Sequence, residues 1–595
     1  MTSPANTRLP ISDDVEAVLP AAISRAHDWL KSTADEEDKA TEQLADLLRD
    51  DDGVKFTMDF VDRVMRPEDD KVAAHALKDI SSHYDPSFLG SINGALVGAG
   101  GFFGPILPNL VMPVARLYMR KMVGHLVLDA ESDALNKILD KAAESGEQLN
   151  LNLLGEAVLG EEEAKSRAER TLKLIKNPRV TYVSVKASSM VAQLNHWDID
   201  GSVERLKERL RPLYQAAADR TDKVFINMDM EEYHDLHLTI RLFKELLSEP
   251  EFLTLDAGIV LQAYLPDTFD ALKDVADFAK ERVAKGGGKV KVRIVKGANL
   301  SMETVQGEVH DWPLATYTNK LDVDANYYRL LDFILREEYA DSVRIGVATH
   351  NLYTAAMAYE LGKKRGVLHM MDSEMLQGMS PAQQAAVRKV FDGRQILYTP
   401  VVHAEDFDVA VSYLVRRLEE NSAPQNFLYA LFAPGEEPLA DQEETFRRAV
   451  AKRWDTFAGA RRTQNRLEED GRQAPRTGRF TNEADTDPAL APNRQWAQEA
   501  LKRNPGEHGI AEVTDPAAVE GHIARAKELG TEWGKRPAAE RAAALEAVAD
   551  QIASQRSKFI SVAAYEANKT VTQTDPEVSE AIDFCTYYGQ SARLL

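Results

Sequence analysis

The chain has 595 residues, of which 44% are hydrophobic and 28% are charged, and its formal net charge is −23 at pH 7. This length exceeds a single hydrophobic core and predicts roughly three or four structural units. The composition excludes a disordered or fibrous protein, and the negative charge argues against nucleic-acid binding as the main activity. Because Cys585 is the single cysteine, the chain has no intrachain disulfide or cysteine-built metal cluster, which suits a reducing cytoplasm.

Residues 1–145 are expected to form an α-helical arm, because apolar residues recur at helical spacing in "VEAVLPAAISRAHDWL" and "VKFTMDFVDRVM". The N-terminus lacks the basic and apolar parts of a secretory signal. Residues 86–115 carry no charge, but glycines and prolines interrupt them repeatedly. Buried packing between domains is therefore favoured, peripheral docking on a bilayer comes second, and a membrane-spanning helix is disfavoured.

Residues 146–433 consist of short β-rich runs, each followed by a helical stretch and turn signals. Eight near-continuous apolar runs alternating with helices predict a closed parallel (β/α)8 TIM-type barrel of the α/β class. An open doubly wound sheet is the alternative. The runs lie near 149–157, 181–188, 224–230, 258–264, 291–298, 343–351, 367–379 and 396–402.

Beyond the barrel, residues 434–492 are charged and interrupted by proline and glycine, which indicates a linker. A helical pattern resumes over 493–595 and stops in what reads as the middle of a domain. A truncated domain is therefore expected at this end, because helices of an incomplete domain lack apolar partners.

Polar residues follow the predicted strands at their C-terminal ends, where a barrel enzyme places its reactive groups. For any one of them an ion pair that caps the barrel is an equally good interpretation, but together they suit a ligand rich in carbonyl and amide groups. They are Lys186, Asp229, Gln262, Lys296, Gly297, His350, Asn351, Gln377, Gly378 and Tyr398.

The segment after the eighth strand has an apolar helical stripe, and the opposite face contains Tyr413, Arg416, Arg417 and Glu420. Helical spacing alone favours a solvated face with an Arg416–Glu420 pair. The functional alternative is that the two adjacent guanidinium groups clamp a substrate carboxylate at the barrel mouth. The apolar stripe contains Phe407, Ala410, Val411, Leu414 and Leu418.

No metal site is expected from the sequence. His234 and His237 are three residues apart on a predicted helix, where packing or capping is the favoured role, and no third ligand has a helpful spacing. A serine nucleophile lacks its G-x-S-x-G setting, and the glycine run at 285–292 precedes a strand and therefore predicts a turn.

The strings "VSVKAS", "RIVKGA", "ATHN", "LQGM", "LYTPVV" and, most specifically, "YLVRRLEEN" closely resemble the proline dehydrogenase family. The chain around them resembles the bifunctional proline utilization A family, in which this barrel precedes an aldehyde dehydrogenase module. The resemblance implies hydride transfer from L-proline to FAD, which produces pyrroline-5-carboxylate, the first step of proline catabolism to glutamate. The second step is not expected, because the NAD-binding fold and catalytic cysteine of that module lie beyond the matching region.

The resemblance also implies roles for single residues. Arg416, Arg417 and Lys186 would hold the proline carboxylate. Glu420 would orient the arginines, Tyr398 and Leu376 would wall the ring, and Asp229 would support Lys186 and the arginine pair. Arg293 would lie nearest the reactive flavin nitrogen. All of the implied flavin contacts are Val260, Gln262, Arg293, Val295, Lys296, Gly297, Ala298, Thr318, Lys320, Thr349, His350, Asn351, Glu374 and Phe427.

The chain departs from the family at "KGANL", where Asn299 and Leu300 replace two aromatic residues that commonly line the flavin. An inactive barrel that acts as a regulatory scaffold is therefore one alternative. Another is a lyase or hydrolase that forms a Schiff base at Lys186 or Lys296. The resemblance also implies a quinone electron acceptor, and hence a cytoplasmic protein that approaches the inner face of the membrane; it leaves a homo-oligomer open.

Overall fold

The structure is a computed structural model. It describes residues 13–33, 51–67, 69–84, 100–102, 104–123, 126–130, 132–155, 158–403, 406, 410, 413, 417, 420, 421, 423–433, 435, 437–469, 479–503 and 513–594.

Eight parallel strands close into the barrel that the sequence predicted. Each strand pairs with the next along the chain, and β9 pairs with both β8 and β2, which completes the ring. A short extra strand, β1 (Leu128–Asp129), extends the sheet beside the end of β9. The barrel strands are β2 (Gln148–Leu153), β3 (Tyr182–Lys186), β4 (Phe225–Asp229), β5 (Ala257–Gln262), β6 (Val290–Val295), β7 (Val343–Ala348), β8 (Met371–Leu376) and β9 (Gln395–Val402).

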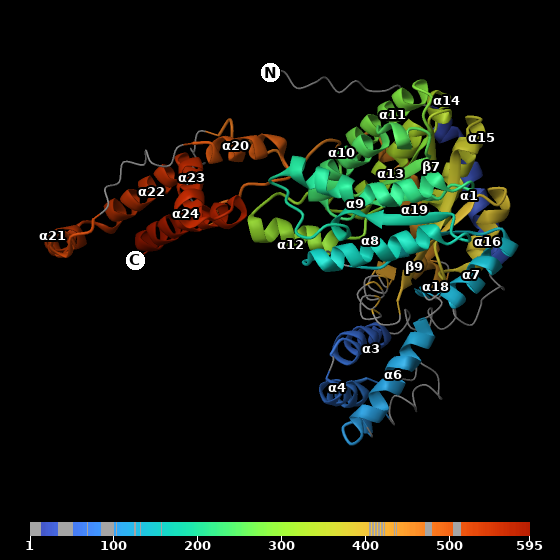
Figure 1. Cartoon of the computed structure of the whole chain (residues 1–595), viewed down its shortest axis with the longest axis horizontal. Coiled ribbons are helices and arrows are strands. Elements are labelled where there is room, and N and C mark those ends of the chain that lie inside the picture. The colour runs from blue at the N-terminus through green and yellow to red at the C-terminus, as the bar shows by residue number, and fades with distance from the viewer. Residues whose placement is uncertain are drawn as a thin grey trace.

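Helices surround the barrel because each strand buries its outward side chains against the helix layer. Val183, Ile226 and Val292 point outward and are fully buried in the main apolar core. Figure 1 shows the helices around the barrel. They are α7 (Ser132–Ser145), α8 (Glu161–Lys176), α9 (Ile199–Asp219), α10 (Leu236–Leu247), α11 (Thr268–Ala284), α13 (Lys320–Ile334), α14 (Glu337–Ala340), α15 (Leu352–Lys364) and α16 (Pro381–Val390). Further helices in the βα connections are η3 (Ala187–Ser189), η4 (Tyr233–Asp235) and α12 (Leu300–His310), and η5 (Pro250–Phe252) and η6 (Leu368–Met370) lie in αβ connections.

Besides α7, which lies just before the predicted barrel range, two further helices from outside that range pack on the barrel. Helix α1 (Asp13–Thr33) lies against α15 and α16, and α19 (Glu437–Lys452) lies against α13. Buried Asp332 accepts hydrogen bonds from Arg365 and Arg453, and Arg365 also binds Asp14 of α1. Part of the expected linker is therefore a helix that belongs to the barrel surface, as is the first helix of the expected arm.

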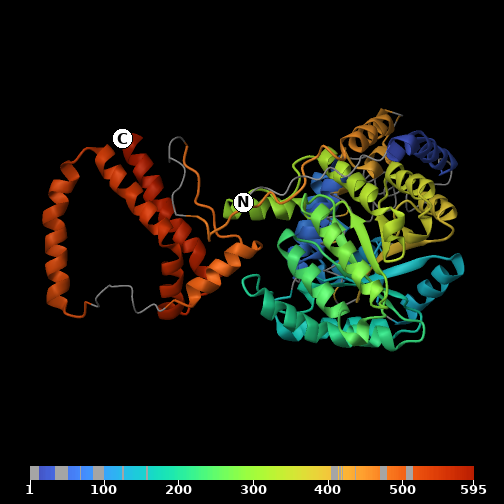
Figure 2. The ribbon, with the colours of Figure 1, turned by 90° about the horizontal axis from the view of Figure 1, so that it is seen from above.

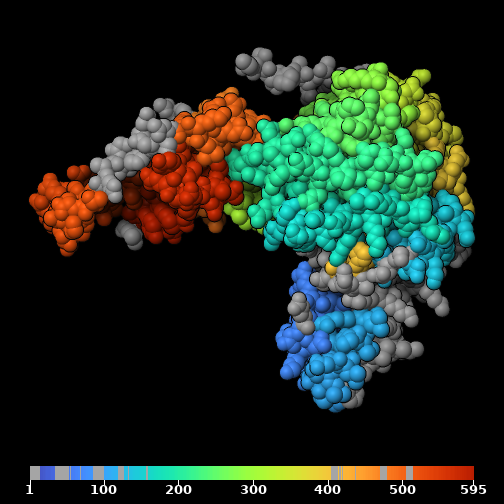
Figure 3. Space-filling model, viewed as in Figure 1, coloured from blue at the N-terminus to red at the C-terminus, as the bar shows by residue number. Residues whose placement is uncertain are grey.

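The rest of the N-terminal arm projects from the barrel (Figures 1 and 3). It contains α3 (Asp51–Phe60), η1 (Val61–Met65), α4 (Asp70–His83) and α6 (Pro108–Val123). Its apolar core continues into Met379, Ala410 and Tyr413, and into α18 (Phe427–Phe432). Much of the uncharged stretch, residues 86–99 and 103, lies outside the described residues. Among the described helices, none combines the length and apolar character that crossing a membrane requires.

The C-terminal helices extend away from the barrel on the other side (Figures 1 and 2). They are α20 (Ala491–Leu501), α21 (Pro516–Lys535), α22 (Ala538–Ser554), α23 (Arg556–Ala567) and α24 (Val571–Leu594). Half-buried Cys585 packs against a small apolar cluster that includes Val578 and Ile582. Its surroundings agree with the packing role that the sequence favoured.

Candidate active site

The inner face of the barrel is polar over most of its strands, because side chains alternate between the two faces of each strand. The pairing register places Lys186 beside Asp229, Val260 beside Arg293, and Leu376 beside Tyr398. These neighbouring positions lie at or near the C-terminal ends of the strands. Most residues that the sequence singled out therefore share one barrel mouth.

Asp229 is the centre of a buried hydrogen-bond network. Its Oδ1 atom accepts from Ser184 Oγ at 3.1 Å and from Asn227 Nδ2 at 2.7 Å. The Tyr398 hydroxyl donates to Asp229 Oδ2 at 3.0 Å and accepts from Asn152 Nδ2 at 2.5 Å. Burial raises the pKa of the Asp229 carboxyl, and nearby Arg293 and Tyr398 oppose that rise. The network holds the Tyr398 ring at the mouth.

Lys186 pairs with a residue that sequence reasoning missed. Its Nζ atom lies 2.5 Å from Oε2 of Glu231, two residues beyond the end of β4. The resemblance assigned this support to Asp229, whose carboxylate instead accepts hydrogen bonds from Ser184, Asn227 and Tyr398. The only signal for Glu231 is its place in the acidic run after the strand.

A buried charge cluster lies deeper in the barrel. Arg293 Nε donates to Glu374 Oε2 at 2.6 Å, and Lys291 Nζ lies 2.5 Å from Glu374 Oε1 and 3.0 Å from Asp372 Oδ2. A side chain at position 346 would collide with Glu374, so Gly346 makes room for the carboxylate. The Arg293 guanidinium also lies 4.8 Å from the centre of the Tyr398 ring. The cluster fixes Arg293 against Tyr398, and sequence reasoning missed Lys291.

The segment after β9 brings Arg417 to the same mouth. Arg417 binds Glu420 through two nitrogens, at 2.8 and 3.0 Å, as the resemblance implied for this carboxylate. Burial lowers the pKa of Arg417, but Glu420 together with Tyr413, Tyr398 and Glu231 outweighs it, so the net shift of the pKa is upward. The predicted partner Arg416 lies outside the described residues, as do Phe407, Val411, Leu414 and Leu418.

Tyr413 does not lie on a solvated face as the helical spacing suggested. It is buried in the apolar cluster between the arm and the barrel, and the Arg417 guanidinium lies 5.4 Å from the centre of its ring. The reason is that the arm covers this side of the segment, a contact that local periodicity does not contain.

His350 is a neutral hydrogen-bond acceptor. The backbone N–H of Leu376 donates to His350 Nε2 at 2.9 Å, which leaves the ring proton on Nδ1. Burial, and then the nearby Arg417, lower the pKa of His350 to about 4. The ring is therefore uncharged at neutral pH, and its Nδ1–H remains a donor.

This low pKa predicts a loss of stability in acid. Below the ordinary histidine pKa of about 6.5 the unfolded chain binds a proton that the folded chain excludes, so stability falls as the pH falls from about 6.5 to 4. Between pH 7 and 5 the difference is about 2 kcal/mol. Urea unfolding at pH 7 and pH 5 measures this difference in the wild type and in His350→Gln, which keeps a hydrogen-bond acceptor but has no imidazole to protonate. An equal loss in both proteins would contradict the assignment.

The peptide at Gly297 lies directly against an aromatic ring. Gly297 has φ +125°, and a Cβ there would lie 2.4–2.7 Å from atoms of the Tyr264 ring. The Tyr264 hydroxyl donates to the backbone oxygen of Glu231, as does Gln262 Nε2 at 3.0 Å. The sequence analysis explained Gly297 by the close approach of a flat ligand. The structure gives another reason for glycine, because the Tyr264 ring leaves no space for a side chain at this position.

Gly297→Ala is expected to destabilise the protein by about 2–4 kcal/mol, because an L side chain is strained at this φ and also overlaps Tyr264. The thermal unfolding midpoint measures the loss. Gly286→Ala is the matched control: Gly286 has φ +79° with nothing within 4 Å of the added Cβ, so it should show the backbone strain alone. Equal losses of stability in the two variants would mean that overlap with Tyr264 does not contribute to the loss in Gly297→Ala.

Lys296 and Lys320 share one carboxylate. Their Nζ atoms each lie 2.5 Å from an oxygen of buried Asp324. Burial lowers the pKa of Lys296, and Asp324 opposes that change. Asn299 is also buried, and its Oδ1 accepts no hydrogen bond within the described part of the chain. Leu300 is exposed, so the two positions that depart from the family differ in their surroundings.

The remaining residues implied as flavin contacts fall into several environments. Asn351 caps α15 by accepting from the N–H groups of Tyr353 and Thr354, so its carbonyl oxygen is engaged. Thr349 Oγ1 accepts from the Asn351 N–H. Val260 and Phe427 are buried, Val295 is half-buried, and Ala298 and Thr318 are exposed.

Comparisons with known proteins support the resemblance of the barrel to proline dehydrogenase. Residues 134–430 match the proline dehydrogenase family, and residues 502–595 match the aldehyde dehydrogenase family. The bifunctional protein PutA of Escherichia coli is 27% identical over 567 residues, which cover 87% of this chain and 41% of the relative. The chain therefore spans less than half the length of this curated relative.

Solved structures give the same result. Proline utilization A from Corynebacterium freiburgense is 44% identical, with a TM-score of 0.73, over 98% of this chain and 48% of that one. The Bdellovibrio bacteriovorus protein, inactivated by N-propargylglycine, is 25% identical, with a TM-score of 0.77, over 97% and 61%. The chain is therefore a relative of proline utilization A and matches its N-terminal portion, which carries a proline dehydrogenase barrel.

Proposed function

We propose that the barrel oxidises L-proline to pyrroline-5-carboxylate with FAD as the electron acceptor. The observation that carries the proposal is the convergence of Arg417, Lys186 and Tyr398 on one mouth, within a region that matches the proline dehydrogenase family. These groups suit an amino acid that presents a carboxylate beside an apolar ring. The relatives' shared name, proline utilization A, supports the same substrate.

The substrate carboxylate would bind the two cations at the mouth. Arg417 is held by Glu420, so its guanidinium keeps a fixed orientation, and Lys186 is held by Glu231. Charge-assisted hydrogen bonds to a carboxylate contribute about 1.5–3 kcal/mol each. Arg416, which lies outside the described residues, would be the third cation. Tyr398, fixed by Asp229, would lie against the pyrrolidine ring together with Leu376.

The residues present fit a flavin. Arg293 offers a buried cation beside Tyr398, and Asn299 has a buried oxygen without a partner among the described residues. Lys296 and Lys320 supply positive charge of the kind that a dinucleotide pyrophosphate requires. When bound, the flavin would accept the two electrons of the reaction. The chain's own task is to orient proline, exclude water and place cations beside the acceptor.

A quinone at a membrane is the proposed final electron acceptor. Leu110, Val114 and Leu117 recur along α6 at helical spacing and are all more than 60% exposed, which suits contact with a lipid surface. Val114→Glu should therefore weaken binding to anionic lipid vesicles without changing proline oxidation by a soluble dye. Unchanged vesicle binding would remove this part of the proposal.

The decisive experiment adds L-proline to the purified protein without oxygen. We expect a flavin spectrum that bleaches on addition of L-proline but not of D-proline, and loss of activity after treatment with N-propargylglycine, as in the Bdellovibrio relative. A bound flavin that L-proline does not bleach would favour a regulatory scaffold instead. A protein without flavin that borohydride traps with its substrate would favour Schiff-base chemistry at a lysine.

A further inference from the structure

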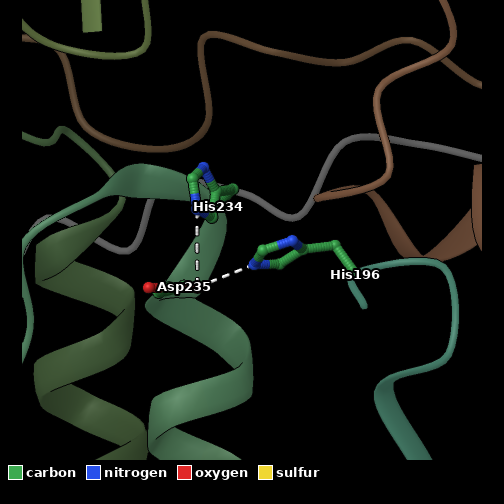
Figure 4. A group of neighbouring side chains, drawn as sticks. All are labelled: His196, His234 and Asp235. Carbon is green, nitrogen blue, oxygen red and sulfur yellow. Dashed lines mark hydrogen bonds and ion pairs between the residues drawn. The ribbon is translucent and has the colours of Figure 1, made fainter. Parts of the chain in front are cut away.

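Three side chains outside the proposed active site meet where two neighbouring βα loops touch. His196 lies in the loop between β3 and α9, and His234 and Asp235 lie in η4, between β4 and α10. His196 Nε2 is 2.7 Å from Asp235 Oδ1, and His234 Nε2 is 3.6 Å from the same oxygen. Figure 4 shows both imidazoles directed at the carboxylate. The sequence offered no third ligand because His196 is 38 residues from His234 along the chain.

The separations of these atoms suit a small divalent cation. One candidate atom from each of the three residues lies within 4.8 Å of the other two. Zinc binds nitrogen and carboxylate oxygen at about 2.0–2.2 Å, so ligand atoms of a tetrahedral site are about 3.3 Å apart. The observed 2.7 and 3.6 Å lie on either side of that value. Oε2 of Glu232 lies 3.0 Å from His234 Nε2 but does not belong to the three-residue group, so a water would supply the fourth ligand.

The ligand types select the class of metal. Two imidazoles with one carboxylate favour zinc and similar transition metals over magnesium and calcium, which prefer oxygen ligands throughout. The site is also partly shielded from water, because Asp235 is buried and both histidines are half-buried. Without a metal, a hydrogen-bonded cluster with a proton on one imidazole is the alternative. Glu232 and Asp235 raise the pKa of His234 to about 9 although burial lowers it.

We propose that His196, His234 and Asp235 form a binding site for a zinc-like divalent cation that ties the two loops together. The loops follow Lys186 and Asp229, the last residues of β3 and β4. A bound ion would thus brace the barrel mouth from outside the proposed substrate contacts. None of the three ligands is among the residues proposed to touch proline or the flavin.

The test titrates Zn2+ into the full chain, purified without a histidine tag and stripped with a chelator, at pH 8, where competing protonation is weaker. A chromophoric chelator reports the affinity. We expect one tight equivalent in the wild type and at least 100-fold weaker binding in His196→Gln and His234→Gln. His237→Gln is the matched control: His237 lies on α10 but lines a separate cavity with Asp200 and Arg241.

Two further measurements keep the result independent of folding and activity. His196→Cys retains a metal ligand, so it should keep the equivalent that His196→Gln loses. Zn2+ should raise the thermal midpoint of the wild type, His237→Gln and His196→Cys but not of His196→Gln or His234→Gln. Co2+ should give the intense visible bands of a four-coordinate site. No equivalent in the wild type, or binding that survives in both His196→Gln and His234→Gln, would overturn the proposal and leave the protonated cluster.

Discussion

Replacing Arg417 by methionine should lower kcat/KM for L-proline about 100-fold. The guanidinium is held by two hydrogen bonds to Glu420 and is proposed to bind the substrate carboxylate. Loss of this charge-assisted contact costs about 3 kcal/mol, and each 1.4 kcal/mol is a factor of ten. Methionine keeps an unbranched apolar stem but removes the guanidinium that lies over the Tyr413 ring, so the flavin content must be checked beside the kinetics. Steady-state kinetics with L-proline, together with the flavin-to-protein ratio, measure the effect.

The control is Arg447→Met. Arg447 forms an exposed pair with Glu443 on α19, so its removal deletes a comparable Arg–Glu contact away from the mouth. It should leave kcat/KM unchanged, because exposed pairs contribute little. The flavin content of Arg417→Met should also stay near that of the wild type. Unchanged proline kinetics in Arg417→Met, or loss of flavin in parallel with loss of activity, would refute the carboxylate role.

Glu374→Gln is expected to cause the largest loss of stability, about 3–5 kcal/mol. Glu374 is fully buried and pairs with both Lys291 and Arg293. The change keeps the shape of the side chain but leaves two buried cations short of a partner, and uncompensated buried charge is strongly destabilising. At roughly 2 °C per kcal/mol for a unit of this size, the thermal midpoint should fall by at least about 6 °C.

Glu338→Gln is the matched control, because Glu338 forms an exposed pair with Lys280 on the barrel surface. It should change the free energy of unfolding by less than about 1 kcal/mol. Equal midpoints for the two variants would mean that the buried cluster adds little to the stability of the barrel. A large loss of stability in Glu374→Gln with activity retained below the midpoint would assign Glu374 a role in stability but not in positioning Arg293 for the reaction.

The eight barrel strands were predictable because each is a short run that buries one face under helices and is followed by a helical pattern. The short strand β1 was not, since two residues such as Leu128 and Asp129 have no periodicity and pair only because β9 runs past the end of β8. The packing of α1 and α19 on the barrel was also missed. Their apolar stripes predict helices, but the surface that covers a stripe depends on the whole fold.

The residues of the candidate site also divide into those that the sequence predicted and those that it missed. Lys186, Asp229 and Tyr398 were found because strand ends in a barrel face one mouth. Glu231, Lys291 and His196 were missed because their importance comes from partners that lie 45, 83 and 39 residues away along the chain. Tyr413 was placed on the wrong face for a related reason, because the arm that buries it comes from the N-terminal region.

By itself the sequence determined the barrel and the residue types at its mouth, since alternation along a strand and the order of βα units are local properties. The resemblance in the motifs added proline and FAD as expectations. Only the tertiary structure decided the pairing of charges: Lys186 with Glu231, Arg293 and Lys291 with Glu374, and His196 with Asp235. Buried or half-buried charges take the partner that is nearest in space, and closing the barrel sets which partner that is.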